Sequence, residues 1–452
     1  MTDDFDLIIS AERVLIDGAF VAASVGIHNG VIAAIGRDLR GADDVRLAAD
    51  EVLLPGLVDT HVHVNEPGRT EWEGFASATR AAAAGGVTTI IDMPLNSIPP
   101  TVDAPALDLK RGVAAGKAVV DVGFWGGAIP GNLGRLRELQ VRGVFGFKCF
   151  LAPSGVDEFP HLDADQLDAA LKEVAALGAV LIVHAEDPGV LAANENAGGT
   201  GYGDFVASRP KEAELVAIDR VIDGVRRTGA RAHILHLSSA AALPRLAAAR
   251  SEGLPITVET CPHYLCFTAE QIPDGATAFK CCPPIRDEGN RDLLWRGLAD
   301  GVIDAIVSDH SPSTRELKLG HGGDFALAWG GIAGLQLGLP AVWTEAGRRG
   351  IRLERVLEWM SRGPADLVGL RGKGRIEVGA DADLVAFAPD VTFTVDVDKL
   401  FHRNRVSAYD GAELAGVVRG TWLRGERVDL TLAAAPRGKL LSRLGTKHAE
   451  TL

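Results

Sequence analysis

Six residues that could hold a metal ion follow apolar, strand-like stretches of this sequence. His61 and His63 form a His-x-His pair at the end of the first such stretch. Residues two apart in a strand point to the same side, and neutral imidazoles are good ligands for divalent cations. The other four, each at or near the end of a later apolar run, are Lys148, His184, His236 and Asp309. This donor set predicts a metal centre.

Each of these residues has a structural alternative when it is taken singly. A lone histidine at a strand end is more often a hydrogen-bonded core residue than a ligand. Lys148 is also compatible with a salt bridge or a surface position, and Asp309 with an N-cap of the next helix. Their joint occurrence decides between the alternatives, because His-x-His, Lys, His, His and Asp at the ends of five of the eight predicted strands rarely arises by chance.

The elements that must position these residues alternate along the middle of the chain. Apolar segments typical of strands cover 54–63, 87–93, 121–126, 144–151, 179–184, 232–237, 256–260 and 305–309. Ala- and Leu-rich helical patterns, such as 73–84, 164–177 and 210–228, lie between them. Eight strand–helix units predict an α/β fold of the (β/α)8 TIM-barrel type, whose chemistry sits at the carboxyl ends of the strands.

The two ends of the chain show a different pattern of short strands. At the start these are 6–9, 13–16, 19–22, 25–28 and 31–35, with the hairpin signals Asp17-Gly18 and Asn29-Gly30 between them. Strand patterns return at 383–387, 391–395 and 416–420. We expect one small β-sandwich built from 1–54 and 366–432, a barrel over 55–365, and a loosely held polar tail over 433–452.

Composition narrows the class of protein. The chain has 452 residues, 47% of them hydrophobic, and a formal net charge of −14. An acidic surface disfavours nucleic acid and anionic membranes as partners. The start of the chain is acidic where a signal peptide would be basic, and no apolar run is long enough to span a membrane. Five cysteines without framework spacing indicate free thiols in a reducing compartment, so we expect a cytoplasmic protein.

The segment Pro55-Gly-Leu-Val-Asp-Thr-His-Val-His63 resembles the opening signature of the amidohydrolase superfamily, in the cyclic amidohydrolase branch. That branch includes dihydroorotases, hydantoinases and allantoinases, and the resemblance extends over about 6–428. It implies two divalent metal ions, one held by His61, His63 and Asp309 and the other by His184 and His236. Lys148, carboxylated by CO2 to N6-carboxylysine, would bridge them.

The same resemblance implies a mechanism. A hydroxide bridging the ions would attack a ring amide, and Asp309 would act as general base and then as general acid. The ligand types suit Zn first, with Co, Mn or Fe as alternatives. A homotetramer is the family expectation.

Departures from family patterns bear on the substrate. Asn65 stands where dihydroorotases usually carry an arginine for a substrate carboxylate, and Pro153 where hydantoinases usually carry a tyrosine. The segments that resemble the allantoinases are 92–97, 146–150, 206–210, 307–312, 328–336 and 405–409, together with Tyr202. The resemblance implies hydrolysis of the hydantoin ring of (S)-allantoin to allantoate, in purine catabolism.

Candidates for substrate contacts are Asn96 and the backbone near Cys282 and Gly330. Asn96 is equally compatible with a turn, and relatives often carry serine at the position of Cys282. Two other functions stay open at this point. One is a hydantoinase or dihydropyrimidinase of other specificity, and the other is a non-catalytic scaffold, which typically lacks metal ligands.

The remaining polar residues near these motifs have weaker assignments. Asp59 either orients His61 or His63 or ties the strand end, with the structural role favoured. His263 is expected behind the ligands, and 320–324, with His321, is a possible lid. We expect His233 to be a packing residue and His310 to face away from Asp309. Four further histidines are expected to be structural, exposed or remote from the site: His28, His161, His402 and His448.

Overall fold

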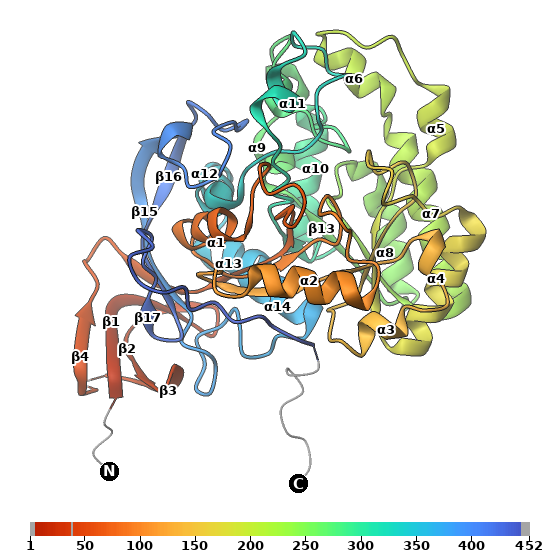
Figure 1. Ribbon diagram of the computed structural model, residues 1–452. Helices are drawn as coiled ribbons and strands as arrows, with labels where there is room; N and C mark the ends of the chain where they lie inside the picture. The colour runs from red at the N-terminus through yellow and green to blue at the C-terminus, as the bar shows by residue number, and fades with distance from the viewer. Residues whose placement is uncertain (1–4, 38, 444–452) are drawn as a thin grey trace.

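The computed structural model describes residues 5–37 and 39–443. Figure 1 shows a β-rich region on one side, which contains both β1–β4 and β15–β17, and a larger helical region on the other. The two ends of the chain therefore meet in one region, as the strand patterns predicted.

The β-rich region is one eight-stranded sheet. Its strands are β1 (Phe5–Ile16), β2 (Ala19–His28), β3 (Val31–Gly36), β4 (Gly41–Arg46), β5 (Val52–Pro55), β15 (Leu384–Thr394), β16 (Glu413–Leu423) and β17 (Glu426–Arg427). They lie in the order β17-β16-β15-β5-β1-β2-β3, and β4 pairs with β1. β15 joins the two chain ends by pairing antiparallel with β5. The sequence patterns missed β4 and split β1 in two, where the structure has a bulge between Ala11 and Val14.

The hairpin turns follow the sequence signals. Asp17 and Gly18 have φ angles of 49° and 76°, and Asn29 and Gly30 have 51° and 80°. Positive φ at both central residues is the geometry of the two-residue turn that Asn-Gly and Asp-Gly favour.

All nine strands of the helical region run parallel to their neighbours. They are β6 (Leu57–Val62), β7 (Val87–Asp92), β8 (Asp121–Phe124), β9 (Gly126–Gly127), β10 (Phe147–Phe150), β11 (Val180–His184), β12 (Arg231–Ile234), β13 (Ile256–Thr260) and β14 (Ala305–Ile306). β6-β7-β8 form one sheet and β9 to β14 another. Only Trp125 separates β8 from β9, and at the other end a parallel bridge joins Val62 of β6 to His310. The segment after β14 therefore lies beside the first strand of this region.

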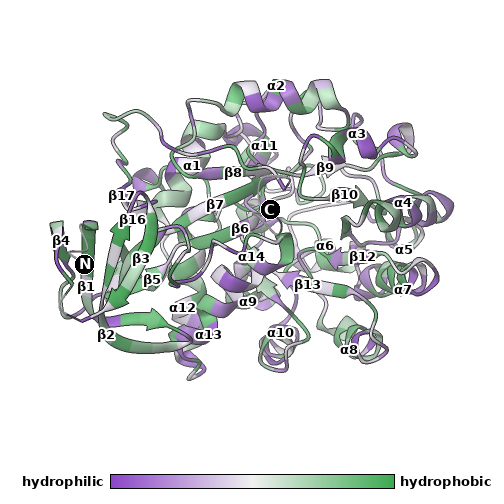
Figure 2. Ribbon diagram, turned by 90° about the horizontal axis from the view of Figure 1, so that it is seen from below, coloured by the Kyte–Doolittle hydropathy of each residue, from purple (hydrophilic) through white to green (hydrophobic). Residues whose placement is uncertain are grey.

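Helices cover the outer side of these strands (Figure 2). The longer ones are α1 (Phe75–Ala84), α2 (Ala104–Ala114), α4 (Ala164–Leu177), α7 (Lys211–Thr228), α8 (Leu243–Ser251), α10 (Glu288–Ala299) and α12 (Gly338–Arg348). The shorter ones are α3 (Arg137–Gln140), α5 (Pro188–Ala193), α6 (Tyr202–Ser208), α9 (Pro262–Cys266), α11 (Arg315–Leu319), α13 (Leu353–Leu357) and α14 (Gly363–Val368). α4 matches its predicted bounds because Asp163 and Gln166 form a capping box and left-handed Gly178 ends it. Within the described residues, every helix is too short or too polar to cross a bilayer.

The described part of the tail is not loosely held. Val122 N donates to Lys439 O at 2.9 Å, and Leu441 N donates to Val122 O at 2.8 Å, so this part of the tail lies along β8. Leu440 and Leu441 also pack against the hydrophobic core. The expectation was wrong for 438–443, because backbone hydrogen bonds and two partly buried leucines attach this polar segment to β8. His448 lies outside the described residues.

Candidate metal centre

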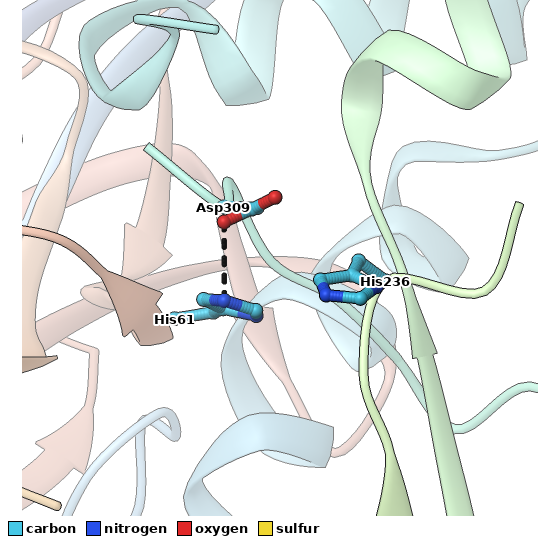
Figure 3. A group of neighbouring side chains, drawn as sticks. All are labelled: His61, His236 and Asp309. Atoms are coloured by element: carbon cyan, nitrogen blue, oxygen red, sulfur yellow. Dashed lines mark ion pairs between the residues drawn. The ribbon is translucent and has the colours of Figure 1, made fainter. Parts of the chain in front are cut away.

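The six candidate ligands are all buried, and they come from the end of β6 and the residue after it, from β10 and β11, and from the turns after β12 and β14. The six residues are 0–7% exposed: His61, His63, Lys148, His184, His236 and Asp309. Figure 3 shows three of them, His61, His236 and Asp309, around one point. One ligand atom from each of these three lies within 4.8 Å of the others.

Asp309 faces both members of the His-x-His pair. Its Oδ1 lies 3.1 Å from Nε2 of His61 and 3.6 Å from Nε2 of His63. The pattern of alternate residues predicted that the two imidazoles would point the same way. This arrangement allows a single cation to bind the carboxylate oxygen and both ring nitrogens.

His184 and His236 form a second pair of close ring nitrogens. Nδ1 of His184 lies 3.0 Å from Nε2 of His236. Two imidazole nitrogens on one tetrahedral zinc ion would be roughly 3.3 Å apart, given zinc–nitrogen bonds of about 2.0–2.1 Å. The rings of His61 and His236 are 5.4 Å apart between centroids, so the two pairs adjoin.

Lys148 lies among these ligands on β10. Its side chain is buried, and Nζ lies 4.4 Å from the centre of the Phe150 ring. His184 stacks on the same ring at 4.6 Å, and Phe159 meets it edge-on at 5.9 Å. Burial lowers the pKa of Lys148 to about 8, which increases the share of the neutral amine at physiological pH.

A carboxylate that sequence reasoning missed fixes His61. Oε1 of Glu259, on β13, lies 2.5 Å from Nδ1 of His61 and accepts a bond from the backbone N–H of His236 at 3.3 Å. Its Oε2 contacts Nε2 of His233 at 3.0 Å. Burial opposes ionisation, but His61 and His233 outweigh it and hold the pKa of Glu259 at about 2. His233, expected only to pack, is therefore a hydrogen-bonding partner of this carboxylate.

A second missed carboxylate contacts His184. Glu186 Oε2 lies 2.8 Å from Nε2 of His184, and Arg209 binds the same carboxylate through Nε, at 3.1 Å, and Nη2. With Nε2 directed to Glu186, it is Nδ1 of His184 that faces His236. Metal-binding histidines commonly have such a carboxylate on the nitrogen that does not bind.

The turn after β12 has its own anchor on α7. Glu214 accepts hydrogen bonds from the backbone N–H groups of Ser238 and Ser239 at 3.0 and 2.9 Å. Arg286 neutralises this buried carboxylate at 2.6 Å. The anchor fixes the chain that follows His236.

Asp59 ties two strand ends together. Its carboxylate accepts from the backbone N–H of His61 at 3.0 Å and of Ser308 at 3.1 Å. These contacts favour the structural role over a direct contact with the imidazoles. Ser308 precedes Asp309, so Asp59 sets the distance between the first and last strands of the site.

Four residues at these strand ends have left-handed backbone angles. His236 and Asp309 have φ angles of 35° and 42°, and Asn65 and Asn96 have 66° and 61°. Residues other than glycine rarely adopt this region, and such positions cluster at functional sites. Asparagine tolerates the conformation, but nothing in the sequence marks His236 or Asp309 for it.

The substrate-contact candidates divide into two groups. Cys282 and Gly330 lie together, because a Cβ atom on Gly330 would be 3.5 Å from Sγ of Cys282. Asn96 is buried in a turn, and its backbone carbonyl accepts from Arg69 at 2.7 Å. The side chain of Asn65 is buried with Oδ1 unpaired.

The other histidines are placed as follows. His263 lies with Cys261 and Asp309 in one cluster, and its buried Nε2 has no hydrogen-bond partner within the described residues. His310 turns to Glu73 at 3.2 Å. The expectation that His402 is remote from this rim was wrong, because its ring packs 4.8 Å from that of His310. His321 is exposed in its loop.

The donor set fits a divalent metal. His61 uses Nδ1 for Glu259, which leaves its buried Nε2 facing Asp309. Neutral imidazole nitrogens and a carboxylate are ligands that zinc and similar ions bind. Asp309 and Glu259 overcome burial and raise the pKa of His61 to about 9, so protons compete with a cation here.

Comparison with known proteins agrees with this geometry. The Amidohydrolase family matches residues 52–428. The chain is 58% identical to an allantoinase of Streptomyces avermitilis over 97% of this chain and 99% of that protein. It is 40% identical to an allantoinase of Escherichia coli, covering 97% and 98% of the two chains. The solved structure of L-hydantoinase (dihydropyrimidinase) from Arthrobacter aurescens superposes with a TM-score of 0.88, at 31% identity and 97% coverage of both chains. This chain belongs to the amidohydrolase family.

Proposed function

We propose that this protein is an allantoinase, which hydrolyses a ring amide of (S)-allantoin to give allantoate in purine catabolism. The observation that carries the proposal is the 58% identity to a named allantoinase over nearly the whole of both chains. A complete set of buried metal donors supports catalysis and argues against a scaffold that has lost its ligands.

We propose that the parallel strands close as a (β/α)8 barrel with a β-sandwich beside it, and that the barrel holds two divalent ions, zinc first. His61, His63 and Asp309 would bind one ion, and His184 and His236 the other. The support is that Asp309 faces both residues of the first pair, while His184 and His236 present nitrogens 3.0 Å apart. Bound ions would polarise the scissile carbonyl and activate water at neutral pH.

Lys148 would enter the site as a carbamate. The neutral amine attacks the carbon of CO2, an N–C bond forms, and the nitrogen releases one proton to solvent. The product is an anionic group with two oxygens, one for each side of the centre. The buried position of Lys148, beside the Phe150 ring on which His184 stacks, supports this role, because burial favours the uncharged amine.

Asp309 would move the proton. Its carboxylate holds the proton that water gives up and delivers it to the ring nitrogen as the amide bond breaks. Glu259 contributes indirectly: it holds Nδ1 of His61, which keeps Nε2 of that ring turned to Asp309.

The substrate would be bound by neutral groups. Allantoin carries no charge and is rich in amide donors and acceptors. Asn96, Cys282 and Gly330 are the proposed contacts, and Asn65 is a neutral amide that cannot pair a carboxylate charge. We further propose a homotetramer, as the resemblance implies. We also propose a cytoplasmic location, in keeping with five cysteines that form no disulfide.

The second candidate is a hydantoinase, favoured by the TM-score of 0.88 to L-hydantoinase. A substrate panel separates the two. We expect the metal-loaded protein to turn over allantoin with a kcat/KM at least a hundredfold above its values for hydantoin and dihydrouracil. Turnover of hydantoin or dihydrouracil without turnover of allantoin would replace the first proposal by the second.

A further inference from the structure

Among the described residues, two of the buried lysines outside the metal centre lack the ion pairs that the others, Lys110 and Lys373, form. Lys318, on α11, is 4% exposed, and Lys280, just before Cys281, is 8% exposed. Within the described part of the chain neither forms an ion pair with a carboxylate. Burying an ammonium group without a counter-ion is costly, so the contacts that these groups make instead are informative.

Both ammonium groups donate to backbone carbonyls of one short segment. Lys318 Nζ donates to the carbonyls of Trp329 at 2.9 Å and Gly331 at 2.5 Å, and to that of Lys280 at 2.7 Å. An ammonium has three N–H donors, and all three are used. Lys280 Nζ donates to the carbonyls of Ala326 at 3.2 Å and Ala328 at 2.5 Å. The two lysines therefore hold the segment 326–331 from one side.

This segment lies against the chain that carries Asp309. Ser311 N donates to Ile332 O at 3.1 Å, and Gly331 N donates to Lys280 O at 2.9 Å. Gly331 has a φ of 122°, and a Cβ atom there would lie 2.3 Å from the carbonyl oxygen of Ser311, so only glycine fits. A shift of 326–331 would therefore move Ser311, which is two residues from Asp309.

The segment also reaches the first loop of the site. The indole of Trp329 lies edge-on to that of Trp72 at 4.8 Å, and Trp72 follows the His-x-His strand. The contact between the two indoles therefore joins the loop that contains Trp72 to the segment 326–331.

The hydrogen bonds from Lys318 and Lys280 to these carbonyls, called the clamp below, determine the direction of the Gly330 N–H. In a trans peptide the C=O and the next N–H are antiparallel. Because the carbonyl of Trp329 points to Lys318, the N–H of Gly330 points away from it. Among the described residues this N–H has no hydrogen-bond partner, and Gly330 lies beside Cys282.

We infer that Lys318, with Lys280, is a positioning residue that fixes 326–331 as one wall of the substrate site and presents the Gly330 N–H to a carbonyl oxygen of the substrate. The contact between Gly330 and the substrate rests on the proposed function. The clamp itself rests on five carbonyl contacts that do not depend on it.

The test compares Lys318→Met, which removes all three donors at similar length, with Lys318→Arg, which keeps donors in place. Lys399→Met is the control, because Lys399 is 82% exposed. Each variant is assayed for KM and kcat on allantoin, for bound metal, and for limited proteolysis near Leu327, which is 64% exposed. We expect Lys318→Met to raise KM at least tenfold, to change kcat less than threefold, to keep its metal, and to be cut within 326–331. Lys318→Arg should have a KM close to that of wild type, and the control should match wild type.

An unchanged KM with an uncut segment in Lys318→Met would overturn the inference. So would a parallel loss of kcat and metal, because that indicates general damage. If Lys318→Met does not fold, Lys280→Met, which removes two of the five bonds, is measured in the same way and judged by the same outcomes. If no variant and no wild-type protein acts on allantoin, the proposed function fails while the proteolysis still decides on the clamp.

Discussion

Glu259 lies 2.5 Å from Nδ1 of His61, although 198 residues separate them in the chain. The same carboxylate holds His233 at 3.0 Å. The contact fixes which ring nitrogen of His61 carries the proton, and it leaves Nε2 for the metal. Orientation by a carboxylate of this kind is worth about 10- to 100-fold in metal affinity or activity.

Replacing this carboxylate should weaken the metal site. We expect Glu259→Gln to lower metal affinity about 10- to 100-fold, because an amide is a weaker acceptor and can turn its NH2 group toward His61. Competition against a chelator measures the change. Glu413→Gln, at an exposed position of β16, is the control. Equal affinities in the two variants would show that Glu259 does not orient the ligand.

Reconstitution of metal-free protein should depend on carbon dioxide. If Lys148 binds metal as a carbamate, metal added in carbonate-free buffer should restore little activity, and added bicarbonate should restore it. Lys148→Ala should bind fewer than two ions and lose at least a thousandfold in kcat with or without bicarbonate. Full recovery of wild type in carbonate-free buffer would argue against carboxylation.

The pair of Glu186 and Arg209 predicts a pH dependence of stability. Burial works against ionisation, but Arg209 and His184 outweigh it and lower the pKa of Glu186 from 4.5 to about 2. A carboxylate with a depressed pKa stabilises the fold above pH 4.5, and that contribution is lost as the pH falls from 4.5 toward 2. The full titration corresponds to about 3 kcal/mol.

Urea unfolding of chelator-treated protein between pH 5 and pH 3 tests this relation. The free energy of unfolding should fall more steeply with decreasing pH in wild type than in Glu186→Gln, because the variant has no carboxylate to protonate. Glu413→Gln should follow wild type. Parallel curves for wild type and Glu186→Gln would show that Glu186 does not contribute.

Two ion pairs of different burial should differ in their effect on stability. Lys110 and Asp92 meet at 2.7 Å with both side chains buried, whereas Arg142 and Asp108 are about half exposed. We expect Lys110→Met to lower the free energy of unfolding by about 3–5 kcal/mol, because it leaves a buried carboxylate unpaired. Arg142→Met should change it by at most about 1 kcal/mol. Similar losses of unfolding free energy in the two variants would contradict the expectation that the buried ion pair contributes more than the exposed one.

The sequence predicted the donors of the centre but not the groups that hold them. His61 and His63 could be found because alternation in a strand puts them on one side, and the later donors because each ends an apolar run. Glu259 and Glu186 follow no local motif, and the partners of Glu259 are defined only when the strands are assembled. A signal for Glu259 was present, since a carboxylate inside the strand Ile-Thr-Val-Glu-Thr needs a buried partner.

Helices and strands were predicted more accurately where the sequence pattern extended over many residues. α4 has clear caps and matched its bounds, and each predicted parallel strand overlaps an observed one. β4 was missed because Gly41-Ala-Asp-Asp44 is polar, and it forms by pairing with β1 rather than by burying its own side chains. The segment 438–443 was misjudged because its partner, β8, lies about 320 residues earlier.

The most direct test of the central claim is a metal titration of the chelator-treated protein, in bicarbonate buffer, followed by the rate of allantoate formation from allantoin. We expect no turnover without metal and a rate that rises to a plateau at two ions per chain, with Asp309→Asn inactive at every ratio. Undiminished hydrolysis of allantoin by protein shown to be free of metal, or by Asp309→Asn, would contradict the claim.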